Sequence, residues 1–263
     1  MWAADCSVGK GSGTMAMITS EIDDLLQPFF RKILLRDELG MEEQRAIAAA
    51  ADQQIHFSAG EDLVREGDRP MRSMLVASGF TCRYRLLADG ERQLTAIHLP
   101  GDFVDLHSFL LKEMDHSVGA LTDCTIITFP HERLVKVTER YPHLTRLLWL
   151  LTLLDGAVHR EWLVGMGRLS ATQRTAHLIC EMYIRLESLG LANDRRFGFP
   201  ITQAALADAV GISTVHVNRV LQELRHRALI VWDGGPMQIL DWAALAEAAE
   251  FDDLYLHLVQ EPR

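Results

Sequence analysis

Residues 212–228, ISTVHVNRVLQELRHRA, gather basic and hydrogen-bonding side chains in a chain of 263 residues whose formal net charge is −10. The stretch sets three arginines and two histidines against a single acid, Glu223. An arginine can donate two bonds to a guanine edge, an asparagine can pair with adenine, and threonine or valine can contact a thymine methyl group. These residues therefore have the chemistry needed to read base pairs in double-stranded DNA.

The surrounding residues predict a helix-turn-helix. Thr202 is expected to cap a first helix, Gly211 to make the turn in the left-handed conformation, and Ser213 to cap a second helix. The predicted DNA-binding residues are the two caps and the outward side chains of the second helix: Thr202, Ser213, Thr214, Val215, His216, Asn218, Arg219, Gln222 and Arg225. Two apolar runs about DGGP, in LIVWDGGPMQIL, predict a hairpin wing after it.

Each of these features also has a purely structural interpretation. Arg219 fits a solvated surface charge, and helix-turn-helix packing occurs in proteins that never bind DNA. The turn glycine, the two caps, the basic residues and the hairpin in the correct order together favour DNA binding. Because the whole chain is acidic, bulk charge cannot hold it to DNA or to an anionic membrane, so the attraction must come from this local patch.

Before this region the residue pattern changes along the chain from helical to strand-like and back to helical. Residues 21–51 have apolar side chains at helical spacing, with a break near Gly40. Residues 55–129 read as short strands separated by turn signals such as REGDRP, ADGE and LPGD, which predicts a compact β-barrel or jelly roll. Beyond Pro130 the helical period returns, and a long helix is expected from His143 to about Met166.

The long helix has a coiled-coil-like stripe whose members are separated by four, three and four residues. One interpretation is a core helix of a single domain; the other, which we favour, is a helix packed on the barrel and on its symmetry mate. The predicted dimer interface consists of Leu147, Leu151, Leu154, Val158 and Trp162. The apolar run LLWLLTLL is too short to span a bilayer, so no membrane partner is expected.

These elements predict an α+β chain in four parts. Residues 1–20 form an N-terminal arm, 21–141 a sensor domain, 142–168 a dimerisation helix with its hinge, and 169–263 a DNA-binding domain with a C-terminal helix. Gly165 and Gly167 mark the hinge. The arm lacks the apolar core of a secretory signal, so a cytoplasmic location is expected.

The sequence resembles the Crp/Fnr family of bacterial transcription regulators over roughly residues 25–240. The resemblance rests on EGD at 66–68, ASG at 77–79, LPGDFVDL at 99–106 and, more specifically, ITQAALADAVGISTVHVNRVLQEL. It implies a cyclic-nucleotide-binding-like β-roll, a dimerisation helix and a winged helix-turn-helix. It also implies a homodimer that binds a two-fold-symmetric operator, contacts RNA polymerase and switches by rotation about the hinge, with activation the commoner outcome.

The recognition helix departs from the family pattern at one position. Arg219 matches the family's arginine, but Val215 stands where the family has a glutamate. The acid that accepts a bond from cytosine is therefore absent, which predicts a different base pair at that operator position.

The effector pocket departs further. Where relatives that bind cyclic AMP have a Gly-Glu pair and an Arg-Ser pair, this chain has Asp105-Leu106 and His116-Ser117, and no arginine lies between Arg92 and Arg133. A buried phosphate would lack its bidentate cation, which argues against cyclic AMP. The predicted effector residues are Asp105, Leu106, His107, His116 and Ser117, and the effector itself stays unknown.

Other possible signals would require particular metal or haem ligands in the chain. An iron–sulfur cluster usually needs four thiolates, and the arm has only Cys6. Haem stays open because one axial ligand suffices; the candidates are His98, His107, His116, Cys82 and Cys124. The motif of Asp102, Asp105 and His107 is read as a turn acid with polar loop residues, so no metal site and no cofactor are predicted.

The four cysteines are scattered, which supports neither a zinc site nor a disulfide framework and fits a reducing cytosol. Oxidation at Cys6 or Cys82 would lack a nearby resolving thiol. A regulator without any small ligand, controlled by its own level, also stays open, as does a haem- or redox-responsive one.

Two other classes of protein fit the sequence less well. A nucleotide-binding regulatory module without DNA function would need the missing arginine and would leave the recognition helix unexplained. An enzyme is not expected, because no G-x-S-x-G, P-loop, H-E-x-x-H or dinucleotide glycine motif is present.

Overall fold

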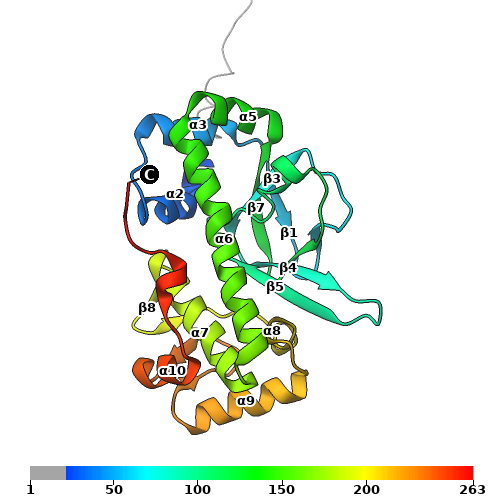
Figure 1. Cartoon of the computed structure of the whole chain (residues 1–263), viewed down its shortest axis with the longest axis vertical. Helices are drawn as coiled ribbons and strands as arrows, with labels where there is room; N and C mark the ends of the chain where they lie inside the picture. The colour runs from blue at the N-terminus through cyan, green and yellow to red at the C-terminus, as the bar shows by residue number, and fades with distance from the viewer. Residues whose placement is uncertain (1–21, 263) are drawn as a thin grey trace, which may run out of the picture.

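The structure, a computed structural model, describes residues 22–262. In it a β-roll with its N-terminal helices, one long helix and a C-terminal helical domain follow one another along the chain (Figure 1). The predicted arm, residues 1–20 with Cys6, lies outside the described residues. The predicted order of strand-rich region, long helix and helix-turn-helix is confirmed.

The β-roll consists of two antiparallel sheets. Its strands are β1 (Gln54–Phe57), β2 (Asp62–Val64), β3 (Arg72–Ser78), β4 (Thr81–Leu86), β5 (Arg92–His98), β6 (Ser117–Ala120) and β7 (Cys124–Pro130). The sheets have the orders β1-β7-β3 and β2-β6-β4-β5. A cluster of buried apolar side chains from both sheets, among them Val76, Val118 and Ile126, holds them together.

Short helices surround the roll. They are α2 (Gln27–Leu34), α3 (Met41–Ala50), α4 (Ser108–Leu111) and α5 (His131–Arg140). The LPGD turn after β5 lies directly against α2, and Gly101 has a φ of +89° there. A Cβ atom at this position would come within 2.7 Å of the Pro28 carbonyl group. The turn therefore needs glycine both for its conformation and for the close contact with α2.

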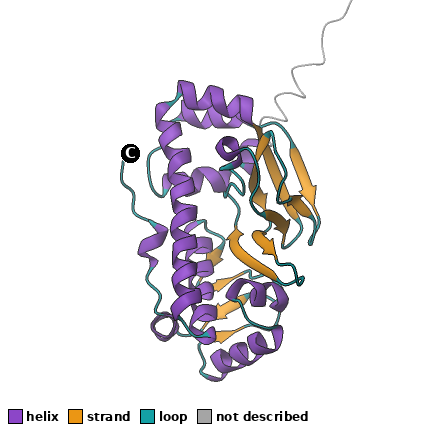
Figure 2. Cartoon of the chain, turned by 45° about the vertical axis from the view of Figure 1, so that its right-hand side comes forward, coloured by secondary structure: helices purple, strands orange, loops and turns teal. Residues whose placement is uncertain are grey.

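The long helix α6 (Pro142–Arg168) runs from the roll to the C-terminal domain (Figures 1 and 2). It starts with proline at a position where the missing N–H costs nothing. Gly165 and Gly167 lie inside the helix rather than breaking it, and the chain turns extended only at Leu169. The break between the two helices, which lies in the predicted hinge region, is thus confined to Leu169 and Ser170, where Ser170 caps the next helix as predicted.

Three members of the predicted dimer stripe on α6 are buried within this chain. Leu147, Leu151 and Leu154 are at most 7% exposed, because they pack into a core with α2 and β7 of the same chain. Val158 and Trp162 are half-buried, and the Trp162 indole donates to Glu181 Oε2 at 2.8 Å. The predicted helix is present, but its leucine face covers the roll of the same chain.

The apolar residues that α6 leaves exposed lie on another face. Trp149 is 65% exposed, Leu153 53% and Leu163 70%, and Gly156 lies between them in the sequence. These residues are separated by four, three and seven positions, which places them on one stripe of the helix.

The C-terminal domain contains the predicted winged helix-turn-helix. Its elements are α7 (Ala171–Ser188), β8 (Ala192–Asn193), β9 (Arg196–Phe197), α8 (Gln203–Val210), α9 (Thr214–His226), β10 (Ile230–Val231), β11 (Met237–Ile239), α10 (Trp242–Ala249) and the 3-10 turn η1 (Asp253–Leu256). Thr202 accepts from the Ala205 N–H at 3.0 Å, and Ser213 from the His216 N–H at 3.3 Å. Gly211 has a φ of +66°, so all three predicted roles are confirmed.

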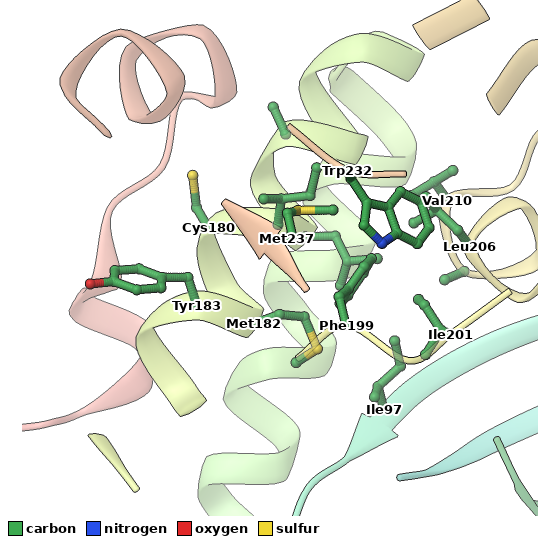
Figure 3. Close-up of a cluster of buried hydrophobic side chains, with 14 of the residues drawn as sticks. Ile97, Cys180, Met182, Tyr183, Phe199, Ile201, Leu206, Val210, Trp232 and Met237 are labelled. Carbon is green, nitrogen blue, oxygen red and sulfur yellow. The ribbon is translucent and has the colours of Figure 1, made fainter. Parts of the chain in front are cut away.

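The two domains share one apolar core. Figure 3 shows Ile97 of β5 beside Ile201 and Phe199 of the C-terminal domain. At the rim of this contact Gln93 donates to the Asp208 carbonyl at 2.8 Å, and Arg92 pairs with the Asp208 carboxylate at 2.8 Å. The helix-turn-helix is therefore docked on the β4–β5 hairpin.

Residues 250–262 form a strap that returns from the C-terminal domain to the N-terminal helices, as the red segment of Figure 1 shows. Arg36 of the loop after α2 donates to the Leu256 carbonyl at 2.8 Å and accepts from the Glu261 N–H at 2.9 Å. Within the described part of the chain, none of the helices is long and apolar enough to cross a membrane.

Candidate functional site

The exposed face of α9 carries most of the predicted reading residues. Thr214, His216, Arg219 and Gln222 are exposed, and Val215 is 64% exposed despite being apolar. Within residues 22–262, Arg219 has no hydrogen bond or ion pair. The four inward residues Val217, Val220, Leu221 and Leu224 are buried as predicted and fix this face outward. The side chains of Arg219 and Val215 are thus accessible to a ligand at the N-terminal half of α9.

Two predicted reading residues are engaged by the protein itself. Arg225 donates to the Trp232 carbonyl at 3.0 Å and so ties α9 to the wing. Asn218 is half-buried and donates to the Thr214 carbonyl at 3.1 Å. The hydroxyls of Thr202 and Ser213 serve as helix caps, as described above. In this structure these four side chains hold α8 and α9 in place. Val215, His216 and Arg219, together with Ser213, line an open groove of about 290 Å³ beside α9.

A second candidate site is a cavity of about 370 Å³ between the roll and α6. Three of the predicted effector residues line it, namely Leu106, His107 and His116. The other two do not: Asp105 is fully buried and accepts from the Met74 N–H at 2.6 Å, and Ser117 accepts from the Glu66 N–H at 3.1 Å. Asp105 Oδ1 and Ser117 Oγ thus hold backbone groups of the roll.

The cavity holds an arginine that the sequence argument missed. Arg83 enters it from β4 and pairs with Asp155 of α6 at 2.9 Å. Burial raises the pKa of the Asp155 carboxyl, but the adjacent Arg83 more than offsets this and holds the pKa below its usual range. The cation and the acid are 72 positions apart, so spacing could not reveal the pair. A signal existed in Asp155, the one charged residue in the apolar run 147–158.

His107 and His116 lie side by side in this cavity, with ring centroids 4.9 Å apart. Burial, and next the charge of Arg83, lower the pKa of His116 to about 4, and burial likewise lowers the pKa of His107. The 2.5 Å contact between His116 Nδ1 and Asp115 is therefore a hydrogen bond from a neutral ring. The Nε2 atoms of both histidines are buried and have no hydrogen-bond partner within the described residues.

The remaining candidate ligands are dispersed. His98 is buried in the roll and hydrogen-bonds Thr81, and the buried thiols Cys82 and Cys124 each have a pKa raised to about 11 by burial. None of these three lines the cavity. Asp102, one member of the predicted acidic motif, pairs with Lys32 and, at 2.9 Å, with Arg185. The motif therefore does not converge, as the turn-acid interpretation expected.

Asp102 also belongs to a buried network that joins the domains and that no sequence pattern indicates. Arg185 of α7 bridges Asp102 in the LPGD turn and Glu181, the latter at 2.8 Å. Glu181, fully buried, also accepts from Trp162 of α6 and, at 3.0 Å, from Tyr255 of the strap. The network connects the roll, α6, α7 and the strap through charged hydrogen bonds.

Comparison with known proteins places both regions. Residues 54–141 match the cyclic nucleotide-binding domain family, and residues 173–248 match the Crp-like helix-turn-helix domain family. The nitrogen fixation regulation protein FixK of Bradyrhizobium diazoefficiens is 30% identical over 203 residues, which is 75% of this chain and 82% of FixK. This chain belongs to the Crp/Fnr family of DNA-binding transcriptional regulators.

Other Crp/Fnr proteins are similar over the same extent. The transcriptional activator protein FnrL of Cereibacter sphaeroides is 27% identical over 74% of this chain and 80% of its own. Among solved structures, FixK2 of Bradyrhizobium japonicum has a TM-score of 0.69 at 23% identity, covering 75% of this chain and 96% of that one. This second likeness shows a shared fold.

Proposed function

We propose that this Crp/Fnr regulator binds a two-fold-symmetric operator as a homodimer, activates transcription in the cytoplasm through contact with RNA polymerase, and has no enzymatic role. The observation that carries the proposal is the exposed face of α9, where Val215, His216 and the unpaired Arg219 face outward together. Activation is proposed because relatives such as FnrL are named transcriptional activators.

The exposed stripe of α6 supports the homodimer. Trp149, Leu153 and Leu163 are large apolar residues left in solvent, and Gly156 between them lets a second helix approach closely. We assign the dimer contact to this stripe in place of the buried leucines. The domain limits near residues 141 and 169 are kept as part of the proposal, with the hinge at Leu169 and Ser170.

We propose that cyclic AMP is not the effector, although an arginine does lie in the cavity. Arg83 lies in the cavity, but Asp155 already neutralises it, so a phosphate would have to displace the partly exposed carboxylate that pairs with this buried arginine. Asp115 adds a second negative group at the rim.

Selection of bound duplexes from random DNA by the purified full-length protein tests the function. We expect enrichment of a two-fold-symmetric site whose half-sites lie about one helical turn apart. A variant in which Val215 is replaced by glutamate should select a different base pair at one position of each half-site. Absence of any enriched sequence, with the protein folded and dimeric, would contradict the proposal.

A further inference from the structure

The chain has a cluster of metal-ligating side chains that the proposed function does not use. His107, Asp115 and His116 line the cavity between the roll and α6, and one ligating atom of each lies within 4.8 Å of the other two. His107 precedes α4, whereas Asp115 and His116 precede β6, so the loop between these elements brings the three residues together.

The state of the two imidazoles is what points to a ligand. His116 is 8% exposed, and its Nε2 atom and that of His107 are buried without a partner in residues 22–262. Buried polar atoms in native proteins nearly always have a hydrogen-bond partner, because a buried atom without one has lost its contact with water and gained nothing in return. Two unmet nitrogens on adjacent rings that line one cavity are thus a preformed pair of electron donors.

Asp115 fixes the tautomer that a ligand needs. A carboxylate can only accept, so the 2.5 Å contact requires His116 Nδ1 to donate its hydrogen to Asp115 Oδ1. The lone pair of His116 is then on Nε2. This carboxylate–histidine arrangement is the one that orients metal-bound imidazoles in proteins. In the ion-free protein this contact sets the tautomer. Because Asp115 is exposed, its carboxylate can leave Nδ1 and turn to an ion bound at Nε2.

We propose that His107, His116 and Asp115 form a binding site for a divalent first-row transition metal ion, of which zinc is the best match. Two imidazoles and a carboxylate are a donor set that suits Zn²⁺, and three protein ligands leave one position of a tetrahedral ion open. The same cavity is also lined by Asp155 and His159 of α6.

The donor atoms must close in slightly around the ion. Tetrahedral Zn²⁺ with bonds of about 2.0–2.1 Å holds its ligand atoms about 3.4 Å apart, compared with the present limit of 4.8 Å. Side-chain rotation, including movement of Asp115 away from His116 Nδ1, would make this change in a cavity of about 370 Å³. The ion would add positive charge beside Asp155, the partner of Arg83 on the long helix.

Titration of untagged, chelator-treated full-length protein with Zn²⁺ alone tests the site. We expect one ion per chain. Replacing either histidine, as His107→Ala or His116→Ala, should weaken binding at least tenfold, and Asp115→Asn about ten- to a hundredfold. His56→Ala is the matched control, because His56 is an exposed histidine on β1 outside the cavity, and it should bind as the wild type does.

A second readout identifies the ligands. Co²⁺ added in place of Zn²⁺ should give the visible d–d bands of a four-coordinate site, and these bands should weaken in Asp115→Asn, whose exposed substitution leaves the core intact. Absence of stoichiometric Zn²⁺ binding overturns the proposal, and so does binding that all three variants retain. A Soret band that His116→Ala removes would assign the histidines to haem and also overturn it. The titration needs no DNA, so its failure is distinct from a failure of operator binding.

Discussion

At the scale of single residues, Arg219 differs from the other arginines near α9 in being unpaired. Arg225 is held by the wing and Arg227 lies 3.8 Å from Glu223, whereas Arg219 makes no such contact within the described chain. Its guanidinium can therefore bind a base without first breaking a hydrogen bond or ion pair within the protein.

We expect Arg219→Ala to lower the affinity for the selected operator by about 1–3 kcal/mol and to relax the preference at one base pair. Competition binding against single-base operator variants measures both effects. Arg69→Ala is the control, since it removes an equally exposed arginine from the roll. Operator affinity that is the same in both variants would remove Arg219 from the reading residues.

His98 makes folding stability depend on pH. It is fully enclosed, hydrogen-bonded to Thr81, and faced by Arg83, Arg185, Asp102 and Asp155. Burial, and next the charge of Arg83, lower its pKa to about 3, compared with about 6.5 in an unfolded chain. Between these two values the unfolded chain takes up a proton that the folded chain does not, so stability falls as the pH falls through this window.

The pH prediction is made with His98→Gln, which keeps a polar group near Thr81 but does not titrate. The free energy of unfolding of the wild type should fall on acidification below pH 6.5 more steeply than that of the variant, by about 1 kcal/mol per pH unit. Denaturant unfolding between about pH 6.5 and pH 4 measures the difference between the two slopes. Parallel curves would mean that His98 is protonated in the fold.

At the scale of elements, α6 has two apolar faces with different partners. One face covers the roll through Leu147, Leu151 and Leu154, and the other is exposed and is assigned to the second protomer. This division explains why the helix is apolar nearly all round.

We expect Leu153→Glu to yield monomers with little loss of folding stability, because Leu153 is 53% exposed and a charge can be solvated there. Sedimentation or light scattering gives the mass, and thermal unfolding gives the stability. Met71→Glu, an equally drastic change at a residue 78% exposed on the roll, should leave the mass unchanged. A dimeric Leu153→Glu protein would locate the interface elsewhere.

The sequence predicted elements well where the signal is local. The caps Thr202 and Ser213 and the turn at Gly211 each act within three or four residues, so they could be identified before the structure. The two faces of α6 could not be told apart, because periodicity shows that a stripe exists and not what covers it. Only part of the cavity lining could be predicted. His107 and His116 are close in sequence and were identified, whereas Arg83 and Asp155 meet only through the fold.

At the scale of the whole molecule, the helix-turn-helix is fastened to the sensor through the end of α8. Gln93 donates to the Asp208 carbonyl and, at 3.3 Å, to that of Ala209, so a sensor side chain supplies part of the helix's C-terminal cap. Arg92 adds a half-exposed ion pair with Asp208.

The double variant Arg92→Ala, Gln93→Ala should loosen this docking by about 1–2 kcal/mol, the sum of one exposed ion pair and a pair of hydrogen bonds. Backbone amides of α8 should then exchange with solvent about tenfold faster, as hydrogen-exchange mass spectrometry would measure. Arg65→Ala, which removes an exposed ion pair within the roll, is the control. Unaltered exchange in α8 would show that the apolar core around Ile97 alone sets the docking.

The strap of residues 250–262 has a mechanical consequence for such a regulator. Once its docking on the β4–β5 hairpin and the Arg185–Asp102 ion pair are released, the C-terminal domain is still attached to the rest of the chain at two separate places, the peptide at Leu169 and the Arg36 contacts of the strap. A body held at one point swivels freely, but a body held at two turns only about the line that joins them, as a door does. In the proposed dimer, the spacing and the tilt of the two α9 helices would therefore change together, along a single arc.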